Sequence, residues 1–123
     1  MGDRCSIAFV NGDMKSVVFS ANWTLPGLVR EVVEYIDDLK AEIARQKPEI
    51  RKAFPLYRLE PDILIVDFIA WFTSDMVRVD EGLYLSKDHE RACNHGNHFD
   101  IDLTKDAAEW IKEAEAQWEE KCS

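Results

Sequence analysis

The stretch that decides the fold is Cys5-Ser6-Ile7-Ala8-Phe9-Val10-Asn11-Gly12-Asp13-Met14-Lys15-Ser16-Val17-Val18-Phe19-Ser20, close to the start of the chain. Two short β-prone runs, 5–10 and 15–20, flank its centre, Asn11-Gly12-Asp13. Asn-Gly between apolar runs is the strongest short-range signal of a β-hairpin. The sequence therefore predicts that the fold begins with two antiparallel strands.

Helical periodicity follows this hairpin. From Leu28 the apolar residues recur at helical spacing, and the pattern ends before Pro48, which cannot continue a helix. Residues 49–59 are mixed and fit either a short helix or an irregular connection. Pro61 starts a further helix that is apolar almost all round, so we expect it between the sheet and the first helix, or in a dimer interface. Thr104 is expected to cap a last helix, with Asp106 in its first turn.

Three more β-prone runs lie at 76–79, 83–86 and 98–103, with a tight turn at Asp80-Glu81-Gly82. The resulting order is ββ-α-(α)-α-βββ-α. A grouping of this kind predicts an α+β fold, in which a mainly antiparallel sheet has helices packed on one face. A length of 123 residues corresponds to a single domain, residues 1–123.

The amino-acid composition argues against some classes of function. A net charge of −9 argues against a general nucleic-acid binder, because phosphate affinity comes mainly from Lys and Arg. The chain opens with polar and charged residues, and the apolar run at 63–72 is too short for a bilayer and carries Asp67. We therefore expect a cytoplasmic protein with no membrane segment and with reduced thiols at Cys5, Cys93 and Cys122.

The loop at 88–100 concentrates imidazole and thiol groups at His89, Cys93, His95 and His98. Such ligands suit zinc or iron, but their spacing matches no established metal motif, and we expect no metal and no cofactor. A thiol nucleophile would need a lowered pKa, a base and an oxyanion site, none of which the loop indicates, so we expect no enzyme activity. Two readings remain open: a solvated loop, or a ligand loop in which Asn94 and Asn97 bind a base edge.

Several other side chains are candidates for binding an anionic, aromatic ligand. The arginines at or near expected element boundaries are Arg4, Arg30, Arg58, Arg78 and Arg91. Surface arginines are commonly solvated or paired with acids, so only two need to converge on a ligand. Trp23 precedes a helix N-terminus, where anions are favoured, although it could equally fasten strand to helix. Tyr84 lies on the exposed side of a short hairpin and could stack on a base.

The opening Met1-Gly2-Asp3-Arg4-x-x-Ile7-x-Phe9, Trp23 after the second strand, and the hairpin Asp80-Glu81-Gly82-Leu83-Tyr84-Leu85 together resemble small phage proteins of the first Thoeris anti-defence family. The resemblance implies an α+β chain that forms homodimers or larger homo-oligomers and sequesters a cyclic ADP-ribose isomer without degrading it. It covers the first strand, the Trp23 loop and about 78–103, and it touches Asp3, Arg4, Trp23, Gly82 and Tyr84. Many relatives follow this Trp at once with a Gly-containing segment, whereas here Gly27 comes after Thr24-Leu25-Pro26.

Residues and resemblance together predict one set of ligand-binding residues: Arg4, Trp23, Arg30, Arg58, Arg78, Tyr84, Asn94, His95 and Asn97. The expected partner is a small cyclic nucleotide held by a homo-oligomer. The alternative is an acidic inhibitor that binds a host defence enzyme or mimics nucleic acid. Its basis is the carboxylates of the last helix, Glu109, Glu113, Glu115, Glu119 and Glu120, although a charge run is usually a solvated face.

Overall fold

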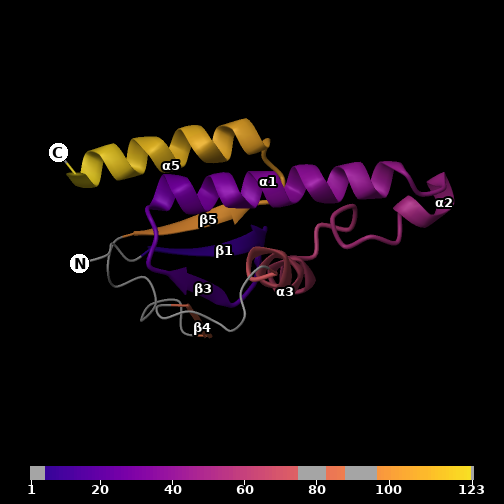
Figure 1. The fold of residues 1–123 in the computed structure, drawn as a ribbon, viewed down its shortest axis with the longest axis horizontal. Helices are drawn as coiled ribbons and strands as arrows, with labels where there is room; N and C mark the ends of the chain where they lie inside the picture. The colour runs from indigo at the N-terminus through magenta and orange to yellow at the C-terminus, as the bar shows by residue number, and fades with distance from the viewer. Residues whose placement is uncertain (1–4, 75–82, 88–96, 123) are drawn as a thin grey trace.

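The computed structural model describes residues 5–74, 83–87 and 97–122, and it is an α+β fold with a mainly antiparallel sheet (Figure 1). The elements are β1 (Cys5–Asn11), β2 (Met14–Lys15), β3 (Val18–Ala21), α1 (Leu25–Ala44), α2 (Pro48–Arg51), α3 (Pro61–Phe72), β4 (Tyr84–Ser86), β5 (His98–Asp102) and α5 (Ala107–Cys122). This arrangement confirms the fold class expected from the sequence. The strand expected at 76–79 and the turn at 80–82 lie outside the described residues.

Strand β1 lies in the middle of the sheet. It pairs antiparallel with β3 and parallel with β5, while β4 continues the sheet beyond β3 (Figure 1). Residues 5–9 of β1 are all buried, so the strand is covered on both faces. The β1–β5 pair joins segments that are far apart in the chain, and it brings the start of α5 next to the end of β1.

A β-bulge divides the second arm of the hairpin. The register with β1 differs by one residue between β2 and β3, and Ser16 and Val17 lie at the break. The Ser16 N–H donates to the Phe9 carbonyl, and the Ser16 hydroxyl accepts from the Phe9 N–H, both at 2.9 Å. The side chain thus replaces a ladder bond that the bulge removes. The hairpin is confirmed, with Gly12 at a φ of 61° in its turn, but the strand expected at 15–20 is two short strands.

Helix α1 begins earlier than its apolar periodicity indicates. Thr24 is its N-cap, and the Thr24 hydroxyl accepts from the Gly27 N–H at 3.2 Å. Pro26 lies in the first turn, where its missing N–H costs no helical hydrogen bond. The expected start at Leu28 is therefore wrong by three residues, whereas the end before Pro48 is confirmed. In the mixed segment, α2 is a short helix followed by turns.

Helix α5 is not capped as expected. The Asp102 carboxylate accepts from both the Thr104 hydroxyl, at 2.6 Å, and the Thr104 N–H, at 2.9 Å. These two bonds hold the pKa of Asp102 below its usual value, and they use the Thr104 side chain in the turn that precedes the helix. The helix begins at Ala107, and the carbonyl of Asp106 accepts from the Glu109 and Trp110 N–H groups.

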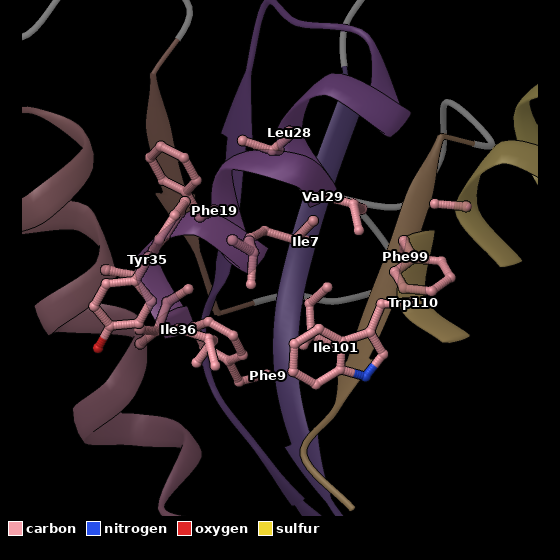
Figure 2. Packing of buried hydrophobic residues seen from close by; sticks show 14 of the residues in the cluster. Ile7, Phe9, Phe19, Leu28, Val29, Tyr35, Ile36, Phe99, Ile101 and Trp110 are labelled. Atoms are coloured by element: carbon pink, nitrogen blue, oxygen red, sulfur yellow. The ribbon is translucent and has the colours of Figure 1, made fainter. Parts of the chain in front are cut away.

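The hydrophobic core lies between the sheet and the layer formed by α1, α3 and α5. Figure 2 shows side chains from β1, β3 and β5 pointing toward the helices, among them Ile7, Phe19 and Phe99. Phe68 of α3 packs edge-on against Phe9 and Phe19, with ring centroids 6.2 Å and 6.0 Å apart. Aromatic packing of this kind fixes α3 across the sheet.

Helix α3 is only partly covered. Leu64, Ile65 and Phe68 are buried, and α3 contacts both β1 and α1, so one side of the helix is covered by the sheet and the first helix. Ile63 and Val66 are 47% and 65% exposed, so the opposite side of α3 presents apolar side chains to solvent beside the exposed Asp62 and Asp67.

Candidate functional site

A cavity of about 490 Å³ opens where β5 leads into α5. It lies between the second half of α1, the connection from α2 to α3, and the first turn of α5. Its lining residues are Ile36, Lys40, Ile43, Ala44, Arg51, Leu56, Tyr57, Leu59, Leu103, Thr104, Lys105, Asp106, Ala107 and Trp110. A volume between about 300 and 1,000 Å³ is typical of small-molecule sites.

The floor of this cavity is apolar and fixed. Ile36 and Ile43 of α1 are buried, as is Leu103 after β5. Trp110 is only 4% exposed, and its indole N–H donates to the Asp102 carbonyl at 2.8 Å. Because that hydrogen bond satisfies the buried N–H, the indole ring can form part of the floor without an unpaired polar group.

One wall, formed by residues 51–59, is held by specific hydrogen bonds. The Arg51 guanidinium donates from Nε to the Gln46 carbonyl at 2.8 Å and from Nη2 to the Ala44 carbonyl at 2.9 Å. It therefore caps the C-terminus of α1, where a positive charge is favoured. At the far end of the wall, Asn11 Nδ2 donates to the Leu59 carbonyl at 3.0 Å, and Leu59 has a φ of 50°.

The rim carries the polar groups that a ligand would meet. Lys40, Lys105 and Tyr57 are all exposed, and Tyr57 is 59% exposed. Within the described residues Lys40 makes no ion pair, whereas Lys105 Nζ lies 3.1 Å from Glu113 Oε1. That contact raises the pKa of the Lys105 ammonium. The rim thus offers an aromatic ring, two ammonium groups and the N-terminal turn of a helix, which together suit an anionic aromatic ligand.

A second polar cluster lies on the sheet face opposite the helices. The Ser6 hydroxyl lies 2.9 Å from His98 Nδ1, and His98 Nε2 lies 2.6 Å from Asp100 Oδ1. With Nε2 protonated toward Asp100, Nδ1 accepts from the Ser6 hydroxyl, which is the order of a nucleophile, a base and an orienting acid. Ser6, however, is only 3% exposed, so a substrate does not reach it. This cluster ties β5 to β1 and is not our candidate site.

Most of the sequence-predicted residues that are described lie at the other end of the sheet from the cavity. The starts of β1, β4 and β5 share that end with the close of β3, which places Tyr84 and Asn97 there. Trp23 follows β3 directly and packs edge-on against Phe72, with ring centroids 5.4 Å apart, yet it stays 40% exposed. Asn97 is only 8% exposed, and its carbonyl accepts from the Ser6 N–H.

The two predicted arginines that the structure describes each pair with a different acid. Arg30 on α1 pairs with Glu115 on α5 at 3.2 Å, and Arg58 pairs with Glu60 at 2.9 Å. Arg58 belongs to the cavity wall segment but does not line the cavity. Arg4, Arg78, Asn94 and His95 lie outside the described residues, as do His89 and Cys93 of the metal hypothesis.

Sequence reasoning missed the cavity residues. Lys40, Tyr57, Lys105 and Trp110 belong to no recognised motif. The available signal was weak: a lysine and an acid, Lys105-Asp106, ahead of an expected helix N-terminus. None of the five predicted ligand residues that the structure describes lines the cavity.

Two further features are absent from residues 5–74, 83–87 and 97–122. No group of His, Cys, Asp and Glu there is arranged to hold a metal ion. No helix in those ranges has the length and apolar character needed to cross a membrane. Comparison of the chain with protein-family models, with curated proteins and with solved structures yields no match.

Proposed function

We propose that this protein binds and sequesters a small cyclic nucleotide, an isomer of cyclic ADP-ribose, and releases it unchanged. The observation that carries the proposal is the cavity of about 490 Å³ with an apolar floor and two lysines on its rim. A nucleotide needs an apolar or aromatic surface for its base and positive groups for its phosphates. Both line the same open cavity.

The biological setting of the proposal rests on the resemblance of the sequence to the Thoeris anti-defence family. In this setting the protein is encoded by a phage and acts in the cytoplasm of the infected host. By holding the signal, it keeps the host defence silent. Sequestration requires no catalytic group, and its effectiveness depends on affinity and slow release.

A homo-oligomer is part of the same proposal. Ile63 and Val66 lie three residues apart on α3, and both are exposed. Two large apolar side chains on one side of a helix favour burial against another surface, and a second copy of the chain supplies such a surface. Size-exclusion chromatography with light scattering tests this point, because Val66→Lys should then shift the protein toward monomer.

The acidic-inhibitor alternative also has an observation in its favour. Glu109 and Glu119 are exposed on α5, although Glu113 and Glu115 of the same helix are paired with Lys105 and Arg30. Exposed carboxylates on a helix can mimic phosphates. Replacing Glu109 and Glu119 by Lys should abolish anti-defence activity if this alternative holds, and should leave it intact if the protein acts by sequestration.

The direct test of sequestration is native mass spectrometry with a panel of cyclic ADP-ribose isomers and cyclic oligonucleotides. We expect a mass increment equal to one ligand per site, with the intact ligand recovered after heat denaturation. Recovery of a cleaved product would indicate an enzyme. No increment with any nucleotide would contradict the proposed function.

A further inference from the structure

The charge around the cavity sets a limit on its ligand. Three basic side chains and one acidic side chain line it: Lys40, Arg51, Lys105 and Asp106. Glu113 adds a second carboxylate next to Lys105 without lining the cavity itself. The local excess of positive charge is therefore small, although the cavity lies in a chain with a net charge of −9.

The three basic groups are not equally available. Arg51 already donates to the Gln46 and Ala44 carbonyls, so its guanidinium maintains the wall. Lys40 has no ion-pair partner among the described residues, and Lys105 is shared with Glu113 at 3.1 Å. A ligand therefore contacts the Lys40 ammonium, which makes no ion pair within the described residues, and the Lys105 ammonium, which is already paired with the Glu113 carboxylate.

We infer that the cavity takes a nucleotide bearing one or two negative charges, that its phosphate lies between Lys40 and Lys105, and that Glu113 competes with this phosphate for Lys105. This inference rests on the proposed function and adds the charge class of the ligand and a specificity-determining residue. A triphosphate brings more negative charge than the two lysines balance, and Glu113 repels the excess. Glu113 thus selects against highly charged nucleotides, including abundant ones such as ATP.

The base of the ligand has one exposed ring to stack against. Trp110 is nearly buried, whereas Tyr57 is 59% exposed on the wall opposite the start of α5. In this pose the ring of the base lies along Tyr57 and the apolar floor. The phosphate then reaches the turn at residues 104–106 and the N-terminus of α5 at Ala107, where N–H groups favour an anion.

The test is isothermal titration calorimetry of the full chain with adenosine, a cyclic ADP-ribose isomer and ATP. The cyclic ligand should bind more tightly than ATP. Lys40→Gln and Lys105→Gln should each weaken its binding by about tenfold, as expected for a charge-assisted hydrogen bond. Lys112→Gln, an exposed lysine on α5 that does not line the cavity, is the matched control and should change nothing.

Glu113→Gln provides the sharper arm of this test. It should tighten binding of the cyclic ligand by about two- to fivefold, the scale of an exposed ion pair, and tighten ATP binding by more. Adenosine, which carries no charge, should be unaffected. Glu119→Gln, with the same charge change at the far end of α5, is the control. Two results would overturn the inference. One is that the wild-type protein binds ATP more tightly than the cyclic ligand. The other is that Glu113→Gln and the wild type bind the cyclic ligand and ATP with equal affinities.

Inorganic pyrophosphate separates failure of the inference from failure of the proposed function. If no cyclic nucleotide binds, but pyrophosphate shifts the amide resonances of residues 104–107 more strongly in Glu113→Gln, the anion site stands and the proposed function falls. If a cyclic nucleotide binds while the lysine variants behave like wild type, the function stands and the inference falls. If neither ligand binds, both are wrong.

Discussion

The two ends of the sheet differ in how their residues come together. At one end, Trp23 comes shortly after β3, Tyr84 begins β4 and Asn97 precedes β5, and each was a candidate because of its own side-chain chemistry. At the other end, the cavity is assembled from side chains of α1, the 51–59 wall and α5, most of them aliphatic or basic residues of no special pattern. A residue with conspicuous chemistry can thus lie away from the cavity, whereas the cavity itself depends on which elements the topology brings together.

The largest effect is expected on the free energy of unfolding, when the tryptophan at each end of the sheet is replaced by alanine. Trp110→Ala should lower the free energy of unfolding by about 3–5 kcal/mol, because it empties the cavity floor and the core and removes the hydrogen bond to Asp102. Trp23→Ala should cost only about 1 kcal/mol, because that ring is 40% exposed. Urea unfolding followed by circular dichroism measures both. Equal losses would remove the structural contrast between the two ends.

Two tyrosines compare the ends for binding. Tyr57→Ala should weaken nucleotide binding by about 1–3 kcal/mol, the usual worth of a base stacked on an aromatic side chain. Tyr84→Ala, at the opposite end, should leave the affinity unchanged while both variants fold normally. Calorimetry with a cyclic ADP-ribose isomer gives the two affinities. The reverse result would move the ligand to the end that sequence reasoning favoured.

Replacing Gly27 by alanine measures how much the contacts of Thr24 and Trp23 contribute to stability. A Cβ at this position would lie 2.7 Å from Thr24 Oγ1 and 3.2 Å from Trp23 Cδ1. Alanine ordinarily stabilises a helix relative to glycine, but here it displaces the N-cap hydroxyl, so we expect Gly27→Ala to lose about 1 kcal/mol. Unfolding of the same substitution in a Thr24→Ala background serves as the control, since the cap is then already absent. A stabilised Gly27→Ala protein would show that the Thr24 and Trp23 contacts carry little energy.

The smallest expected effect is the pH dependence of stability that Glu31 causes. Burial, with the nearby Glu34 carboxylate, raises the pKa of Glu31, so its ionised form is less favourable in the folded than in the unfolded chain. The resulting cost is present at pH 7 and disappears as the pH falls through the raised pKa. Glu31→Gln should therefore stabilise the protein at pH 7 by up to about 0.5 kcal/mol, and the gain should vanish by about pH 4. A gain that persists in acid would assign the effect to packing.

The fold was largely predictable because its signals are local. The Asn11-Gly12 turn, Pro61 at a helix start and the apolar periodicity of α1 each act over a few residues. The two local predictions that failed were changed by side-chain hydrogen bonds. The Ser16 hydroxyl accepts from the Phe9 N–H at the bulge that divides the expected strand, and the Thr104 hydroxyl donates to Asp102 instead of capping α5.

The candidate site was not predictable in the same way. Lys40, Tyr57 and Trp110 come from three separate segments, and they meet only because β5 pairs parallel with β1 and returns the chain to α1. No sequence spacing indicates that these three residues lie close together in the fold. The parallel pairing of two strands so distant in the chain is a product of the tertiary fold.

The most direct test of the account is a ¹H–¹⁵N correlation spectrum of the protein titrated with a cyclic ADP-ribose isomer. The account predicts that the largest shifts fall on Lys40, Tyr57 and residues 104–107, around the cavity. Shifts concentrated instead on Trp23, Tyr84 and Asn97 would contradict it and would place the ligand at the opposite end of the sheet.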